Sequence, residues 1–130
     1  MPMIDLGIEG KKIVLFGTGS VALLFHGLFA KKCRILCFCD NNNSNQGKKI
    51  KGKPVIDPKN ITEYEFDYVL IASSFDLEIY DQLVNQLAIK PRQISVVPID
   101  LLRVMAKKQK FRRYTIISII LVVIAWYLKR

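Results

Sequence analysis

Short apolar runs and helical stripes alternate along residues 11–97. Apolar runs at 13–16, 34–39 and 68–72 have the length and composition of strands buried on both faces, and 93–97 is expected to be a fourth strand. Apolar residues recur at helical spacing over 20–31 and again over 77–89, which predicts two helices. Residues 54–56 are expected to be extended. This order predicts an α/β fold: a single open parallel sheet with flanking helices and right-handed crossovers.

The C-terminal residues follow a different pattern. A short helix is expected over 98–108, and residues 114–128 are then 15 consecutive uncharged residues, nine of them Ile, Leu or Val. Such a segment favours membrane insertion by about 3–5 kcal/mol. As a helix it spans roughly 22 Å, against a hydrocarbon core of about 30 Å, and flanking cations and bilayer thinning can absorb the difference. We expect a hydrophobic helix that crosses or inserts into a membrane. The alternative is a buried strand or a helix that packs in an oligomer.

The charge distribution supports this division of the chain. The net charge is +9, from 20 basic and 11 acidic residues, but seven of the basic residues and no acidic residue lie in 107–130. Residues 1–106 therefore carry only +2, and they lack the alternation of basic and aromatic residues that favours nucleic acid. Five cations precede the apolar segment and two follow it. The positive-inside rule then predicts a cytoplasmic domain anchored to the inner membrane by a C-terminal span.

A glycine-rich motif follows the first predicted strand. Residues 17–22 read G-x-G-x-x-A and open a helix, which is the setting of a dinucleotide-binding loop. Gly17 would make the tight turn, Gly19 would let the backbone approach a phosphate, and Ala22 would allow close packing of helix on strand. The free N–H groups at the start of the helix would supply an anion site.

Polar residues follow the other two central strands. Asp40 ends the second strand, 21 residues after Gly19, where its carboxylate could accept hydrogen bonds from ribose hydroxyls. Residues 72–74 would form the neighbouring wall, because the carboxyl ends of parallel strands meet at one edge of the sheet. The alternative is that the glycines serve only a turn and Asp40 only caps a loop. The predicted cofactor-binding residues are Gly17, Thr18, Gly19, Ser20, Val21, Asp40, Asn41, Ala72, Ser73 and Ser74.

The cysteines favour a reduced chain without a metal. Cys33, Cys37 and Cys39 lie within seven residues of one predicted strand, where neighbours do not pair easily. Their spacing lacks the C-x₂-C turn of zinc sites. The only histidine, His26, lies in another element, and we interpret it as a helix-packing residue. We therefore expect no metal and buried thiols.

Residues 11–97 resemble the Rossmann-like N-terminal nucleotide-binding domain of bacterial nucleotide-sugar epimerase, dehydratase and sugar acetyltransferase proteins of polysaccharide biosynthesis. The resemblance rests on the blocks KKIVLFGTGSVA, CFCDNNNSNQGKKIKGKPVI and FDYVLIASS. It implies NAD(P) or a UDP-sugar as ligand. The chain departs from these proteins because it has no room for their second domain, and no Tyr-x-x-x-Lys pair is present at Tyr64, Tyr68 or Tyr80.

These observations lead to two functional hypotheses. The first is a membrane-anchored nucleotide-binding module, with residues 1–100 as the Rossmann-like domain, 101–113 as a basic linker and 114–128 as the anchor. It would be accessory to cell-surface polysaccharide or nucleotide-sugar metabolism and would have no nucleic-acid partner. The alternative is a subunit or fragment of a nucleotide-sugar epimerase or dehydratase whose catalytic residues lie on a separate chain. No catalytic residue is assigned here, because no complete catalytic set is visible.

Overall fold

The computed structural model describes residues 7–129, apart from the side chains of residues 109 and 111–114. The chain divides into two compact units, Met1–Ile99 and Asp100–Arg130, which are considered separately.

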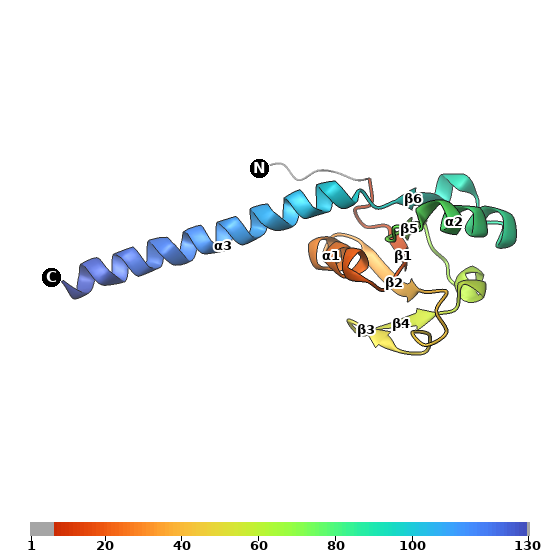
Figure 1. The fold of residues 1–130 in the computed structure, drawn as a ribbon, viewed down its shortest axis with the longest axis horizontal. Helices are drawn as coiled ribbons and strands as arrows, with labels where there is room; N and C mark the ends of the chain where they lie inside the picture. Colours follow the sequence, from red (N-terminus) through yellow and green to blue (C-terminus); the bar gives the residue numbers. More distant parts are fainter. Residues whose placement is uncertain (1–6, 130) are drawn as a thin grey trace. The chain divides into compact units, whose positions relative to one another are not determined.

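One six-stranded sheet organises the first unit (Figure 1). Its strands are β1 (Lys12–Phe16), β2 (Arg34–Cys39), β3 (Lys49–Ile50), β4 (Lys53–Ile56), β5 (Tyr68–Ile71) and β6 (Ile94–Val96). Their order across the sheet is β3-β4-β2-β1-β5-β6. The strand order therefore reverses at β1, because the chain adds strands on the β2 side first and on the β5 side afterwards. The limits of the four predicted strands are confirmed to within one or two residues at each end.

The sheet is parallel except at one edge. The pairs β1–β2, β1–β5, β2–β4 and β5–β6 are parallel, and β3 pairs with β4 in the antiparallel sense. Lys51 and Gly52 join β3 to β4 with φ of 52° and 77°. Positive φ at both central residues is the geometry of a tight hairpin turn. The prediction of a wholly parallel sheet was wrong at this edge. The strand β3 has only two residues, which is too short to show a hydrophobic pattern in the sequence.

Helices lie on both sides of the sheet (Figure 1). They are α1 (Ser20–Phe29), α2 (Asp76–Asp81) with its π-helical continuation η2 (Gln82–Gln86), and the 3₁₀ turns η1 (Pro58–Glu63) and η3 (Pro91–Gln93). The predicted helix over 77–89 is thus present as α2 and η2. This helical segment ends before Ala88, whose φ of 55° is not helical and which precedes Pro91 by three residues. The prediction for 20–31 is confirmed as α1, which ends two residues early.

Side-chain alternation divides the core between the two faces of the sheet. Val14 and Phe16 of β1 belong to a cluster that includes Ile61 of η1 and Ile79 and Leu83 of the α2–η2 helix. On the α1 face the buried aromatic rings of Phe25 and Phe29 stack with centroids 4.9 Å apart. The two faces are therefore filled by different helices, which fixes the sheet between them.

The three cysteines are buried and free, as expected. Cys37 and Cys39 belong to the same cluster as Val14 and Phe16, where they pack as small apolar side chains. Burial raises the pKa of the Cys37 thiol to about 12 and also raises that of Cys39. Within residues 7–129 as described, no group of three or more metal-ligating side chains is present.

The second unit is built on α3 (Ile99–Leu128), one continuous helix of 30 residues. Its apolar side chains between Ile116 and Leu128 are 48% to 78% exposed. No helix in the described part of the chain is long and apolar enough to cross a membrane. The prediction of a transmembrane helix over 114–128 is therefore not supported, because its uncharged run is shorter than the roughly 20 residues that a span needs. Arg130 and the side chain of Tyr114 lie outside the described residues.

Candidate nucleotide-binding crevice

Backbone hydrogen bonds hold the carboxyl ends of the three central strands together. The N–H of Gly17, after β1, donates to the carbonyl of Cys39 at 2.8 Å. The N–H of Ala72, after β5, donates to the carbonyl of Phe16 at 2.8 Å. The predicted segments after β1, β2 and β5 therefore begin side by side at the point where the strand order reverses. In open α/β sheets a crevice forms at this point and binds ligands.

Gly17 has a backbone conformation that requires glycine. Its φ is +133°, and a Cβ built on it would lie 2.5 Å from the carbonyl oxygen of Ala72. Any side chain there would collide with backbone that is fixed by the β1–β5 pairing. The close approach of these two segments thus depends on Gly17.

Gly19 has no such requirement from the fold. Its φ is −86°, it is the N-cap residue of α1, and a Cβ built on it meets nothing within 4 Å. No side chain caps this helix terminus. Gly19 therefore leaves open space in front of the first turn of α1, where backbone N–H groups carry a partial positive charge.

Asp40 connects the glycine loop to the loop that follows β2. Its Oδ2 accepts hydrogen bonds from the Thr18 hydroxyl at 2.5 Å and from Nδ2 of Asn45 at 2.8 Å. Its Oδ1 accepts the N–H of Asn42 at 2.9 Å. Three of the roughly four acceptor positions of the carboxylate are thus occupied by the chain itself. The predicted residues Thr18 and Asp40 are brought into direct contact.

These contacts keep Asp40 ionised. Partial burial acts to raise the pKa of its carboxyl, but the hydrogen bonds from Thr18, Asn42 and Asn45 favour the charged form and hold the pKa below its ordinary value. A negative charge therefore stands at the end of β2, beside the glycine loop. It can accept further hydrogen bonds from hydroxyl groups, and it disfavours phosphate at the same place.

A cavity of about 320 Å³ opens between these strand ends and α2. Gly17, Asp40, Asn41 and Ser73 line it, whereas the other predicted site residues lie outside its walls. Ala72 is buried at the end of β5, Ser74 is exposed, and Gly19, Ser20 and Val21 begin α1. Ser73 also accepts the N–H of Phe75 at 3.2 Å, which shapes the turn into α2. Of the predicted residues, four therefore line the cavity, three lie at the start of α1, and Thr18, Ala72 and Ser74 belong to neither group.

The wall that α2 and η2 contribute to the cavity was not predicted from the sequence. Phe75, Glu78, Ile79 and Gln82 also line the cavity, and Phe75 is 66% exposed. Their spacing of three, four and seven residues places them on one face of a helix, and that spacing was the available signal. The lining contains two carboxylates, Asp40 and Glu78, and no cation. The cavity thus suits hydroxyl and amino donors, and the start of α1 suits an anion.

Two amide side chains form a bridge at one side of this cavity. Nδ2 of Asn41 donates to Oε1 of Gln82 at 2.9 Å, and Nε2 of Gln82 donates to Oδ1 of Asn41 at 2.8 Å. A second cavity of about 370 Å³ is lined by the same two residues and lies between the loop after β2, η1 and η2. We call this reciprocal contact the amide bridge. It is a shared wall of the two cavities.

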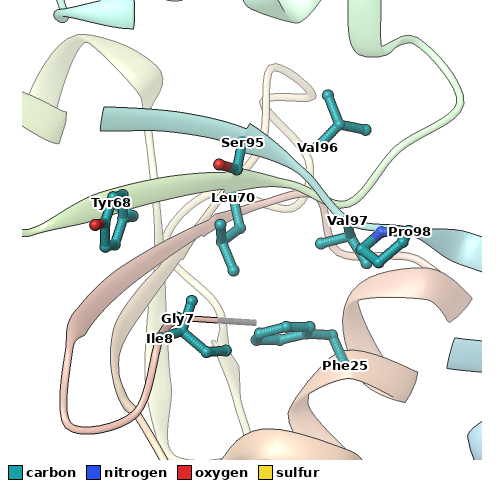
Figure 2. A pocket seen from close by; sticks show the side chains of 9 residues that line it. All are labelled: Gly7, Ile8, Phe25, Tyr68, Leu70, Ser95, Val96, Val97 and Pro98. Carbon is teal, nitrogen blue, oxygen red and sulfur yellow. The ribbon is translucent and has the colours of Figure 1, made fainter. Parts of the chain in front are cut away.

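A further cavity, of about 380 Å³, lies away from these strand ends (Figure 2). Figure 2 shows Leu70 of β5 and Phe25 of α1 pointing into the space beside Ile8. Its polar side chains are the hydroxyls of Tyr68 and Ser95, and its lining has no charged side chain. It therefore has no cationic side chain to pair with a phosphate.

His26 packs on β2, as the sequence analysis interpreted it. Its ring lies 6.1 Å from the ring of Phe38, centroid to centroid. Partial burial, together with the positive charges of Lys51 and Lys53, lowers its pKa. These lysines of the β3–β4 hairpin therefore act electrostatically on α1, and they line neither of the two cavities that share the amide bridge.

Comparison with solved structures identifies the fold. The chain is similar to UDP-D-quinovosamine 4-dehydrogenase from Vibrio fischeri, with 19% identity and a TM-score of 0.53 over 66% of this chain and 75% of that one. It is also similar to RSP, a Rex-family repressor, with 16% identity and a TM-score of 0.53 over 82% and 63%. RSP in complex with β-NAD+ and operator DNA gives 14% identity and a TM-score of 0.51 over 83% and 61%.

At these identities the similarity shows the fold alone, which is Rossmann-like. The chain spans less than two thirds of the length of both repressor chains. Because one of these structures contains operator DNA, our expectation that the chain has no nucleic-acid partner receives no support from the comparison. Comparison with curated proteins gave no match.

Sequence comparison places the chain in a family. Residues 9–95 match the family described as C2185-like, N-terminal. The matched range begins just before β1 and ends within β6, so it contains every residue of the crevice and the whole sheet except for Val96. The chain belongs to the C2185-like family, and its Rossmann-like unit is the N-terminal domain of that family.

Proposed function

We propose that the first unit binds a nucleotide, either NAD(P) or a UDP-sugar, at the carboxyl ends of β1, β2 and β5. The phosphates would lie at the start of α1, in the open space that Gly19 leaves. A ribose would lie beside Asp40, whose carboxylate accepts hydrogen bonds from hydroxyl groups. The rest of the nucleoside would enter the cavity between Asp40 and Phe75.

The observation that carries this proposal is the separation of charge within the crevice. The uncapped start of α1 favours an anion, whereas the carboxylates of Asp40 and Glu78 favour hydroxyl and amino groups. A nucleotide likewise carries an anionic phosphate next to the hydroxyl groups of its ribose. Two neighbours of the same fold support the ligand class, because one is named for a UDP-sugar and the other was solved with β-NAD+.

Isothermal titration calorimetry of the full chain with NAD, NADP, UDP-sugars and coenzyme A tests the proposal. We expect one of the first three classes to bind with a stoichiometry near one. A chain that binds none of them would not be a nucleotide-binding module. NADP is expected to bind more weakly than NAD, because its 2′-phosphate would approach the charged Asp40.

We further propose that this module works at the cytoplasmic surface of the inner membrane, accessory to cell-surface polysaccharide or nucleotide-sugar metabolism. The support is the apolar surface of α3 between Ile116 and Leu128, which is largely exposed, together with the five cations that precede it in the sequence. Exposed apolar surface of this extent favours lipid over water, and the cations favour anionic headgroups.

Co-sedimentation with anionic lipid vesicles tests the membrane proposal. The full chain should pellet with the vesicles, and the double variant Ile120→Asp/Val123→Asp should stay in solution. Leu77→Asp is the matched control, because Leu77 is also an exposed apolar residue, 79% exposed, but lies on α2. Equal sedimentation of the double variant and the wild type would show that α3 does not hold the chain on lipid.

A further inference from the structure

The amide bridge between Asn41 and Gln82 joins two parts of the chain that are 41 residues apart. Asn41 follows β2, and Gln82 begins η2, so the bridge connects the loop after β2 to the helical segment after β5. Asn41 is exposed and Gln82 is partly exposed. A pair of neutral hydrogen bonds near solvent adds little to stability and can exchange for other partners at small cost.

The bridge also separates two cavities of similar size. Gly17 and Asp40 line the cavity on one side, of about 320 Å³. Asn43, Gln46 and Gln86 line the cavity on the other side, of about 370 Å³. Either volume alone is near the lower limit of ligand sites, which range over about 300–1,000 Å³. If the two amides turned away from each other, the two cavities would become one crevice that leads away from the glycine loop.

The bonding pattern of the bridge resembles that of a nucleobase edge. A primary amide presents one acceptor and one donor side by side, and each amide of the bridge uses both toward the other. The edges of adenine and uracil present the same adjacent donor and acceptor, and Asn and Gln amides bind adenine in this bidentate way. Each amide therefore occupies the position that a base edge could take against its partner.

We propose that Asn41 and Gln82 bind the edge of a nucleobase, and that the cavity beyond the bridge accommodates the base. This proposal rests on the proposed nucleotide function and assigns the base end of the same ligand. In the free protein the two amides satisfy each other, and on binding both exchange that partner for the base edge. The lining beyond the bridge includes the amides of Asn43, Gln46 and Gln86 and the charged side chains of Asp57 and Lys59, which offer further donors and acceptors to the ring.

Three ligands separate the base from the rest of the nucleotide: AMP, UMP and ribose 5-phosphate, each titrated calorimetrically into the full chain. The wild type should bind AMP or UMP at least about tenfold more tightly than ribose 5-phosphate. Gln82→Leu and Asn41→Leu should each weaken that nucleotide about tenfold or more and leave ribose 5-phosphate unchanged. Asn85→Leu is the control, because Asn85 is an η2 amide that bonds Asp81 and lines neither cavity.

The outcomes distinguish this proposal from the one on which it rests. Nucleotide affinity that stays within about twofold in both bridge variants, or that falls equally for ribose 5-phosphate, would overturn the base-binding role alone. A wild-type chain that binds NAD or a UDP-sugar but neither AMP nor UMP would also overturn the base-binding role alone. A wild-type chain that binds none of these nucleotides overturns both proposals. If a variant does not fold, NMR of the wild type decides: the side-chain amide signals of Asn41 and Gln82 should shift with the nucleotide and not with ribose 5-phosphate, and signals that shift with neither ligand would overturn the role.

Discussion

The hydroxyl of Thr18 donates a hydrogen bond of 2.5 Å to Oδ2 of Asp40 and so joins the glycine loop to the end of β2. The two residues are 22 positions apart, and each follows a different central strand. Asn45 donates to the same carboxylate oxygen and lies 3.4 Å from the Thr18 hydroxyl, Nδ2 to Oγ1. Asp40, which the sequence predicts as a ribose-binding residue, therefore also holds the glycine loop and the loop after β2 together.

Thr18→Val should raise the pKa of Asp40 and destabilise the chain at neutral pH. The variant removes one of the hydrogen bonds that favour the ionised carboxyl, at a cost of about 1 kcal/mol for a partly exposed bond to a charged group. Because the folded-state pKa of Asp40 is depressed, its contribution is present above the unfolded value of about 3.9 and is lost as the pH falls through the folded value.

Carbon-13 NMR titration of the Asp40 carboxyl and urea denaturation at pH 7 check this prediction. Thr62→Val, at an exposed threonine of η1, is the control for the loss of a hydroxyl. An Asp40 pKa that does not move in Thr18→Val would show that the short contact does not hold the charge.

Gly17→Ala should destabilise the first unit strongly. The added Cβ would lie 2.5 Å from the carbonyl oxygen of Ala72, and the φ of +133° is strained for any residue with a side chain. We expect a loss of about 2 kcal/mol or more, measured by thermal or urea unfolding. Gly47→Ala provides a comparison, because Gly47 also has a positive φ, of +81°, but open space around it. Equal losses in the two variants would mean that the contact with Ala72 adds nothing to the strain of the backbone.

His26 should titrate below its ordinary pKa and reduce stability in mild acid. Partial burial and the charges of Lys51 and Lys53 lower its pKa. The unfolded chain therefore takes up a proton first, and the stability present above about pH 6.5 is lost as the pH falls through the folded value. Imidazole NMR titration measures this pKa directly, and in Lys51→Gln it should move up toward 6.5. A His26 pKa at or above 6.5 in the wild type would contradict the packing described for α1.

The three thiols should resist alkylation until the chain unfolds. The pKa of Cys37 is raised to about 12, and burial also raises those of Cys33 and Cys39. Iodoacetamide at pH 8 should therefore label none of them in native buffer and all of them in denaturant, as read by intact mass. Rapid labelling of one thiol in native buffer would place that residue outside the core.

The first unit was largely predictable because its buried strands are continuous apolar runs. β2 was predicted with the same limits that it has, and the α2–η2 stripe lies on the core through Ile79 and Leu83. The β3–β4 hairpin was missed, because its pairing depends on two positive-φ residues and not on hydrophobic period. In the crevice, Gly17 and Asp40 carry local sequence signals. The partners that complete the site, Asn45 and Gln82, come from loop geometry and from a contact across 41 residues.

Gly19 provides the most direct test of the central claim that a nucleotide binds at this crevice. A Cβ built on Gly19 meets nothing within 4 Å, and the same is true of a Cβ built on Gly27, in the middle of α1. We therefore expect Gly19→Leu and Gly27→Leu both to fold, whereas only Gly19→Leu places a side chain in front of the helix terminus. Calorimetric titration of NAD or a UDP-sugar, whichever the wild type binds, should show binding lost in Gly19→Leu and kept in Gly27→Leu. Equal affinity in both variants would contradict the account.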